Sequence, residues 1–493
     1  MIYKRYGQNN YCMNEISINK AASPRAGTGV MIFYGIGRAA EAIKSRVFET
    51  FLFFYYVQVL EVPGSAAGTA VGIALIFDAL TDPVIGSYSD RFSSKWGRRH
   101  PFMLLSVAPL TISFLLLMIP PDGLSVTGLS VWLCVFAVLV RGSLTLFHVP
   151  YLSLAPELVT DYDQRTTLVI ARNIMLIIGS ATAFFVGFTW FFSSTPEFEN
   201  GQLNADAYPP YAVCMAILMV ICILLCVFGT SRHIPYLAQP KTTKVFNLFS
   251  IFDDLKDALR NKSFLSIFVG MLFYFVYSGM HSTMNLHIGT YFWELSAVEF
   301  NLYALTVAAG AFSGLPVAHF AMSRFDKKPA YLILIATSVF FISAPVILRL
   351  IEWFPDNNHP LFLYVYFTMT FAGLTAGMAA GTASASMVMD TTDEQELSSG
   401  QRQEGVFFGA VSFSGKAASA LGHVLAGFVI DWIRFPLGSD VRPGSVSEDI
   451  IWELGFYYGP MVALLPLVTI YMVNKGYSIS RKRHAEILAE IRK

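Results

Sequence analysis

Two aspartates lie four residues apart in FDALTDP, residues 77–83, within an otherwise apolar stretch. At this spacing Asp78 and Asp82 share one face of a helix. A charged side chain at the centre of a bilayer costs about 2.5–3.5 kcal/mol on insertion scales, so each carboxylate needs a partner, water or a ligand. Two neighbouring carboxylates repel each other, and either a small cation or a bound proton relieves that repulsion. The pair therefore predicts a monovalent metal-ion site for Na⁺, or else a site for H⁺.

A lysine in a distant apolar segment supplies a positive charge. Lys416 lies in VSFSGKAASALG, and Ser412 lies one turn earlier on the same helix face, where its hydroxyl could join a cation site. Two carboxylates and one ammonium sum to a charge of −1, which one monovalent cation would neutralise. The alternative is a structural ion-pair network that holds two parts of the chain together. Both interpretations stay open, and they overlap, because a cation site can also join those parts.

Polar residues in other apolar segments are candidates for substrate contact. In GRAAEAIKSRVFETF, Glu41 and Lys44 are three residues apart, close enough on a helix to pair. Their segment forms either a self-neutralising stripe beside an aqueous cavity or part of a substrate site. The other candidates are Thr145, His148, Arg172, His281 and Asn285. A histidine in an apolar helix is more often a packing residue than a ligand, whereas the charge of Arg172 cannot be shed.

The elements that position these residues are membrane helices. The 493 residues are 54% hydrophobic and 14% charged, whereas soluble proteins have about 25% charged residues. Twelve apolar runs are long enough to cross about 30 Å of hydrocarbon. We therefore predict an all-α membrane protein with twelve transmembrane helices in two six-helix bundles. The expected spans are 32–60, 66–89, 101–120, 127–157, 167–193, 209–230, 264–288, 296–322, 330–350, 361–389, 402–432 and 451–474.

Lys and Arg concentrate in alternate loops and in the C-terminal segment. By the positive-inside rule both termini are cytoplasmic, as an even number of crossings also requires. The sequence predicts a multi-pass protein of a cell membrane, with a bacterial inner membrane as the expected location. The expected parts are a cytoplasmic tail 1–30, a first bundle 31–231, a cytoplasmic linker 232–262 with an amphipathic helix, a second bundle 263–475 and a cytoplasmic tail 476–493.

Several function classes are disfavoured by the sequence. The formal net charge of zero gives no indication of a nucleic-acid partner, and the five cysteines lack metal-ligand spacing. The two halves echo each other, as in SYSDRFSSKWGRRHP and AMSRFDKKP. Parallel repeats of a six-helix unit are typical of transporters with a site between the halves. A channel or a membrane-bound enzyme is the rival, but no nucleophile elbow or histidine cluster supports an enzyme. We expect no cofactor beyond the coupling ion.

Three motifs resemble those of one family: FDALTDPVIGSYSDRFSSKWGRRHPFML, FHVPYLSLAPELVTDYDQRTTLVIARN and MVMDTTDEQELSSGQRQEGVFFGAVSFSGKAASALG. They resemble the glycoside–pentoside–hexuronide:cation symporters of the major facilitator superfamily, which include the melibiose permeases. The resemblance covers nearly the whole chain from about Tyr34. It implies Na⁺- or H⁺-driven sugar transport by alternating access. It also implies a cation site at Asp78, Asp82, Thr145 and Lys416, and a sugar contact at Arg172. The implied cytoplasmic gating loop contains Asp90, Arg91, Arg98 and Arg99.

The departures from melibiose-type members lie on the substrate side. Ala42, beside Glu41, stands where such members place an aspartate, and His148 and Leu152 replace a sugar-binding aspartate and a stacking tryptophan. A melibiose-like galactoside is therefore disfavoured. A sugar or glycoside, including a uronic-acid type, is the first expectation. A lysophospholipid or another amphiphile is the alternative within transport, and a non-transporting membrane sensor or scaffold is the alternative outside it. We expect a monomer whose partners are a small-molecule substrate and the lipid bilayer.

Overall fold

The computed structural model describes residues 27–159, 162–236, 256, 258–400 and 404–491, and within these ranges the chain forms helices and no strands. The predicted amphipathic helix of the 232–262 linker falls mainly on residues outside this description, as does most of the 1–30 tail. The α-helices are α1 (Thr28–Arg46), α2 (Gly64–Arg91), α3 (His100–Leu105), α4 (Val107–Met118), α5 (Val126–Leu158), α6 (Tyr162–Val186), α7 (Tyr208–Ser231), α9 (Lys262–His287), α10 (Ala297–Arg324), α11 (Lys327–Leu350), α12 (Phe362–Ser399), α13 (Glu404–Trp432), α14 (Glu448–Phe456), α15 (Leu464–Gly476) and α16 (Arg481–Ile491).

Shorter helical turns extend several of these helices. They are the π-helical segments η1 (Val47–Leu52), η2 (Tyr55–Val59), η3 (Gly187–Phe191), η7 (Ile288–Phe292) and η8 (Tyr457–Met461), and the 3₁₀ turns η4 (Gly201–Leu203), η5 (Ala205–Ala207) and η6 (Ile234–Tyr236). Among the described residues, eleven helices are long and apolar enough to cross a membrane. The segment from Thr28 to Val59 is a further long helix, set apart by its charged residues. These helices confirm the predicted all-α architecture.

One helix differs clearly from its expected length. The sequence predicts a span over 361–389, but α12 continues to Ser399. The added turns, DTTDEQELSS, are too polar for hydrocarbon, yet they contain Glu, Gln and Leu, which are good helix formers. Hydropathy marks where a helix leaves the membrane, and the helix itself ends later.

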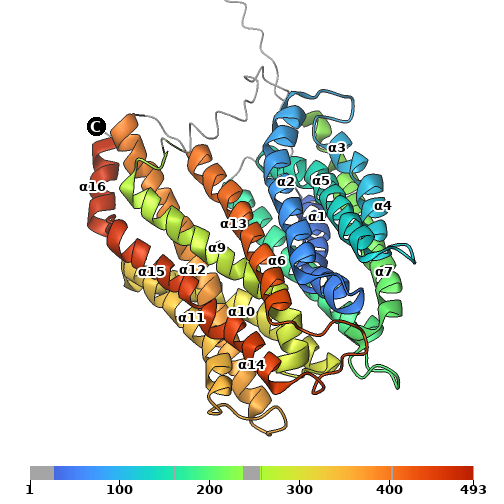
Figure 1. Cartoon of the computed structure of the whole chain (residues 1–493). Helices are drawn as coiled ribbons and strands as arrows, with labels where there is room; N and C mark the ends of the chain where they lie inside the picture. Colours follow the sequence, from blue (N-terminus) through green and yellow to red (C-terminus); the bar gives the residue numbers. More distant parts are fainter. Residues whose placement is uncertain (1–26, 160–161, 237–255, 257, 401–403, 492–493) are drawn as a thin grey trace, which may run out of the picture.

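The helices form two groups that meet along α2 and α13. Figure 1 shows α1–α7 on one side and α9–α16 on the other, with α2 beside α13. Glycines allow these two helices to touch backbone to backbone. A Cβ atom added to Gly427 would lie 2.0 Å from the carbonyl oxygen of Gly64, and one added to Gly68 would lie 2.5 Å from the carbonyl oxygen of His423. Larger residues would force the helices apart.

Hydrogen bonds tie the two groups together at the end that lies away from α16 (Figure 1). The Asp431 carboxylate of α13 accepts hydrogen bonds from the backbone N–H groups of Gly64 and Ser65, at 2.7 and 2.8 Å. These amides begin α2 and have no partner within the helix, so a carboxylate is well suited to them. Gln58 donates to the carbonyl oxygens of Pro436 and Gly438 at the same end.

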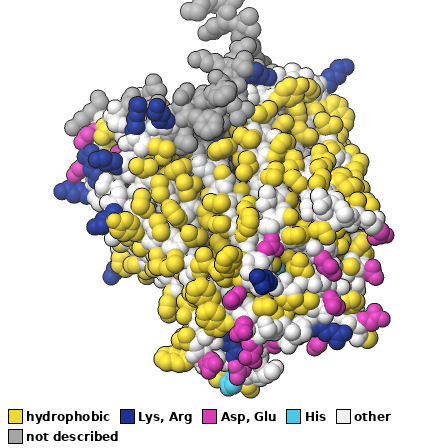
Figure 2. Space-filling view, in the orientation of Figure 1, with side chains coloured by type: hydrophobic (Ala, Val, Ile, Leu, Met, Phe, Trp, Pro, Cys, Tyr) yellow, Lys and Arg dark blue, Asp and Glu magenta, His cyan; other side chains and the backbone are white. Residues whose placement is uncertain are grey.

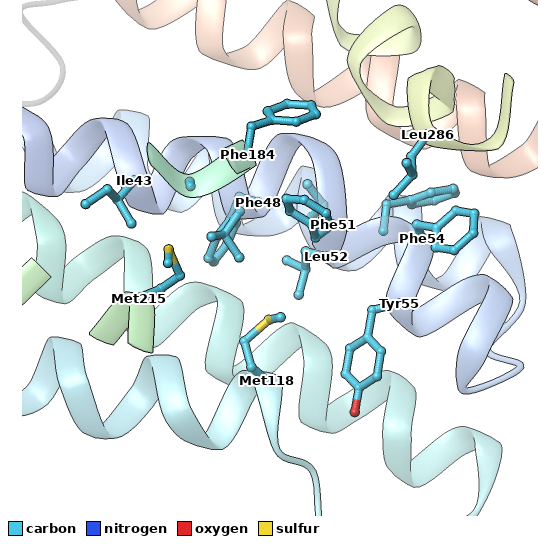
Figure 3. Close-up of a cluster of buried hydrophobic side chains, with 14 of the residues drawn as sticks. Ile43, Phe48, Phe51, Leu52, Phe54, Tyr55, Met118, Phe184, Met215 and Leu286 are labelled. Carbon is cyan, nitrogen blue, oxygen red and sulfur yellow. The ribbon is translucent and has the colours of Figure 1, made fainter. Parts of the chain in front are cut away.

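Aromatic residues fill the interior of the first group. Figure 3 shows Phe48, Phe51 and Phe184 among the buried side chains of this cluster. The Phe51 ring lies 5.1–5.8 Å from four aromatic rings, those of Phe184, Phe188, Phe192 and Tyr211. Rings at these separations add packing energy beyond the area that they bury. The first helix is thereby held against α6 and α7.

Large apolar side chains also cover the outside of the molecule, as lipid contact requires. Figure 2 shows a broad hydrophobic face, with Lys and Arg gathered near the α16 end and Asp and Glu toward the opposite end. Phe320, Phe340 and Tyr364 are 61–75% exposed. Such continuous exposed apolar surface is rare on soluble monomers. The surface therefore agrees with the multi-pass membrane location.

The contact between α2 and α13 can be tested with one methyl group. Gly427→Ala places a Cβ against the Gly64 carbonyl, and overpacking of this kind costs about 1–3 kcal/mol. We expect the helices to separate at this end. A cysteine placed at Ser65, in a background without the native cysteines, should then react faster with a membrane-impermeant maleimide.

The matched control is Gly409→Ala on the same helix, where an added Cβ meets no described atom within 4 Å. Equal labelling rates in the two variants would show that the tight contact does not hold this end closed.

Candidate functional site

Asp78, Asp82 and Lys416 meet at the interface between the two groups of helices. The Lys416 ammonium lies 2.9 Å from Asp78 Oδ2 and 2.5 Å from Asp82 Oδ2. The aspartates belong to α2 and the lysine to α13, so this ion pair joins the two halves of the chain. Only 15–27% of each side chain is exposed. The low exposure limits screening of the ion pair by water.

Thr145 of α5 completes the oxygen-lined side of this cluster. Its Oγ1 lies 3.0 Å from Asp78 Oδ1 and 3.1 Å from Asp82 Oδ1, and 3.1 Å from the Arg141 carbonyl oxygen. A hydroxyl has one proton and two acceptor lone pairs, so it can donate to one carboxylate while its lone pairs face a cation. Three oxygen atoms from two helices thus converge on one point, which suits a small hard cation.

Arg141 is a member of the cluster that the sequence analysis missed. Its Nη1 lies 3.4 Å from Asp78 Oδ2, and its guanidinium carbon lies 5.4 Å from the centre of the Phe48 ring. With Arg141 included, two carboxylates and two cations sum to zero, so the expected net charge of −1 is corrected. The signal was present: Arg141 is a lone charge within an apolar run, one turn before Thr145. Ser412 does not join the cluster, since it is exposed and makes no hydrogen bond to the aspartates within the described residues.

The candidates of the first helix have different partners from those expected. Glu41 pairs with Arg38 at 3.2 Å and accepts from Ser45 at 2.9 Å. Within the described part of the chain no ion pair joins Glu41 to Lys44. The Glu41 carboxylate is already bound by Arg38 and Ser45, which lie one turn away on either side. Lys44 is buried, with its ammonium 5.4 Å from the centre of the Phe48 ring.

His148 and Arg172 lie in the same half as Glu41. Arg38 Nη1 lies 3.4 Å from His148 Nδ1, so the arginine is placed between the histidine and Glu41. Arg172 lies on α6 near Tyr34, a buried residue of α1 whose ring stacks on Tyr151. These residues form a polar group within the first half, and the structure does not bring them to His281 or Asn285.

His281 and Asn285 face a cavity of about 300 Å³ in the second half. The His281 ring lies 4.4 Å from the Tyr277 ring and 4.2 Å from the Tyr458 ring, measured between centres. Asn285 Oδ1 accepts from the hydroxyls of Tyr303 and Tyr458. The predicted substrate residues therefore fall into two groups, one in each half. His281 and Asn285, the second group, line this cavity of about 300 Å³.

A smaller cavity of about 180 Å³ lies between this space and the ion cluster. Arg141 lines it, and so do Ser278 and Ser282, which also line the His281 cavity. Arg141 contacts Asp78 directly. The small cavity thus shares Arg141 with the ion cluster, and it shares Ser278 and Ser282 with the His281 cavity.

The predicted gating loop is held by ion pairs within the first half. Arg99 lies 2.5 Å from Asp90 and 3.2 Å from Glu157, and Arg98 lies 2.6 Å from Glu157. Arg91 is the last residue of α2. The ion pairs of the loop therefore hold the end of α2 to the end of α5, and these two helices carry the aspartates and Thr145.

Comparison with known proteins agrees with this arrangement. The model of the family described as "MFS/sugar transport protein" matches residues 33–481. The chain is 23% identical to the "Glucuronide carrier protein homolog" of Escherichia coli (strain K12), over 94% of each chain. It is 22% identical to the "Sodium-dependent lysophosphatidylcholine symporter 1" of Xenopus tropicalis, over 93% of this chain and 90% of the relative.

Among solved structures, a D-xylose–proton symporter superposes with a TM-score of 0.59 at 12% identity, over 91% of this chain and 98% of that one. At this identity the likeness shows the fold, while the family model spans most of the sequence. The chain therefore belongs to the MFS/sugar transport protein family and is a membrane transporter rather than an enzyme.

Proposed function

We propose that the chain is a symporter that couples entry of Na⁺ or H⁺ to transport of a sugar or glycoside by alternating access. The observation that carries this proposal is the carboxylate pair of α2 held by the ammonium of α13. The cation would bind at Asp78 and Asp82 with help from the Thr145 hydroxyl. The names of the relatives support both parts, since one is called a glucuronide carrier homologue and another a sodium-dependent symporter.

The geometry provides a way to couple ion binding to movement. Lys416 and Arg141 together already balance the two aspartates, so an arriving cation would take the place of the Lys416 ammonium. Displacing Lys416 removes an ion pair between the halves and leaves α2 and α13 freer to separate. Each ligand must then raise the affinity of the other by the same factor, because linkage between two sites is reciprocal.

A lysophospholipid or another amphiphile is the second candidate. It is favoured by an apolar cavity of about 340 Å³, lined by residues such as Leu176, Ala308 and Met378. The name of the Xenopus relative agrees with it.

We further propose that both termini are cytoplasmic. Arg481, Lys482 and Arg483 begin α16, and Lys327 and Lys328 begin α11. Lys327 pairs with Asp390 of α12, and His484 of α16 pairs with Asp393, so these basic segments lie together. By the positive-inside rule this end faces the cytoplasm. The end closed by Asp431 and Gly64 would then face outward.

Asp82→Asn tests the coupling role. The amide keeps the size of the side chain but removes the charge that a cation needs, and 1.4 kcal/mol of lost binding energy would already weaken cation affinity about tenfold. We expect cation-driven accumulation in proteoliposomes to fall to the level of empty vesicles, with a normal gel-filtration profile. Asp356→Asn is the control, since that side chain is 83% exposed. Normal accumulation by Asp82→Asn would refute the coupling role.

Lys416→Gln tests whether the ammonium competes with the cation. Removing one partner of a buried ion pair costs about 3–5 kcal/mol, because the other charge is left uncompensated. In the absence of the coupling ion, which means without Na⁺ or at high pH, we expect the variant to have a lower melting temperature than the parent protein. Adding the coupling ion should then raise the melting temperature of the variant by more than it raises that of the parent. A smaller rise would mean that Lys416 helps to hold the ion and does not compete with it.

A further inference from the structure

Two cavities in the structure meet at Arg46. The polar chamber is the His281 cavity, about 300 Å³, lined among others by Ser278, Ser282 and Asn285. The apolar chamber, about 340 Å³, lies between α6 and helices α10 and α12, with Leu176, Ala308 and Met378 in its wall. Arg46 lines both. Ligand pockets for small molecules span about 300–1,000 Å³, so the two chambers together suit one ligand larger than a single sugar.

Arg46 is placed to bind an anion. Among the described residues that line the two chambers, it is the one Lys, Arg, Asp or Glu side chain. Its Nε is buried and has no hydrogen-bond partner in the described part of the chain. Its ion pair with Glu49 is long, at 3.9 Å, and 46% of the Glu49 side chain is exposed. The Arg46 guanidinium carbon lies 5.6 Å from the centre of the Phe184 ring, a contact that leaves the in-plane N–H donors available for a carboxylate or a phosphate.

The polar chamber contains further unused hydrogen-bonding groups. His281 Nε2 and the Tyr277 hydroxyl are buried, and neither finds a partner among the described residues. Leaving such groups unpaired costs free energy, so they are commonly paired by a ligand or water. The stacked rings of Tyr277, His281 and Tyr458 provide flat faces beside them. Hydroxyl groups of a ligand head would satisfy these donors and acceptors.

We propose that the substrate is an anionic amphiphile bound across the two chambers. Its acidic group would contact Arg46 at their junction, its hydroxylated head would occupy the polar chamber, and its apolar group the apolar chamber. A sugar acid joined to an apolar aglycone has this chemistry, and so does a lysophospholipid with its phosphate and acyl chain. This inference rests on the proposed symport function. It assigns the anion contact to Arg46 and not to Arg172, which lies outside both chambers.

Binding of four probes to the protein in lipid nanodiscs tests the proposal. Phenyl β-D-glucuronide has the acid, the hydroxyls and the apolar group. Phenyl β-D-glucoside lacks the acid, and D-glucuronate lacks the apolar group. Lysophosphatidic acid supplies the phosphate alternative. We expect phenyl glucuronide or lysophosphatidic acid to bind at least about tenfold more tightly than both partial probes, since each missing group removes a 1.4 kcal/mol contact or more. The tighter of the two identifies the source of the anion. Equal binding of the neutral glucoside would overturn the proposal.

Variants separate the contributions of the two chambers. Arg46→Gln should reduce the affinity for the anionic amphiphile to that of the neutral glucoside, and Arg46→Lys should lose less. Ala308→Phe fills the apolar chamber but leaves Arg46, so it should weaken binding of the amphiphile and leave binding of D-glucuronate unchanged. This variant tests the proposal even if Arg46→Gln fails to fold. Arg349→Gln, which lines neither chamber and is paired with Asp356, is the control. Loss of binding in Arg172→Gln with normal binding in Arg46→Gln would overturn the assignment.

The ion response separates this proposal from the symport function. In Arg46→Gln the thermal stabilisation by the coupling ion should persist, because Asp78, Asp82 and Thr145 are intact. If the parent protein shows ion-dependent transport but no preference for anionic amphiphiles, the substrate inference fails and the symport function stands. If the parent binds the amphiphile without any ion dependence, the symport function fails and the substrate inference stands.

Discussion

The structure depends on one ion pair placed where two groups of helices meet. Two carboxylates from α2 each lie within 2.9 Å of one ammonium from α13, mostly out of water. Such charges are costly to desolvate, and their attraction offsets that cost only while all of them stay together. Arg141 balances one carboxylate within the first half, so the second carboxylate and Lys416 depend on each other or on a replacement ion. Under the proposed symport function, a small cation at this site would change the relative position of the halves.

Close helix packing is what brings this lysine within reach. Gly64 and Gly427 allow α2 and α13 to touch, and α13 makes an equally close contact on its other side. An added Cβ on Gly279 of α9 would lie 2.4 Å from the Ser419 carbonyl, and one on Gly422 would lie 2.4 Å from the Val276 carbonyl. α13 is thus packed between α2, which carries the aspartates, and α9, which carries His281 and Asn285. Close-packed interfaces of this kind transmit small shifts, because they cannot deform continuously.

Sequence spacing predicted the parts of the site that lie on one helix, but it could not identify contacts between helices. Asp78 and Asp82 share a face because they are four residues apart, and hydropathy located the helices that hold them. The Glu41–Lys44 pair was equally reasonable by spacing, yet Arg38 and Ser45 take the carboxylate. Arg141 was visible as a charge in an apolar segment and Arg46 as one of several charges in the first helix, but their roles depend on which neighbouring helix each one faces. Ser412 lies one turn from Lys416 on the same helix, yet it is exposed.

The separation of the ion cluster from the larger cavities restricts how the two can communicate. Arg141 contacts Asp78 and lines the small chamber, and Ser278 and Ser282 line both that chamber and the polar chamber. A substrate in the polar chamber and an ion at the cluster, as proposed, would therefore influence each other without direct contact. In the proposed mechanism an ion that displaces Lys416 would change the contacts of α13, and α9 packs directly on α13. A ligand in the polar chamber contacts α9 as well. In the proposed mechanism the shared element would be the α9–α13 pair, and both ligands would have to favour one position of it relative to α2 for transport to be coupled.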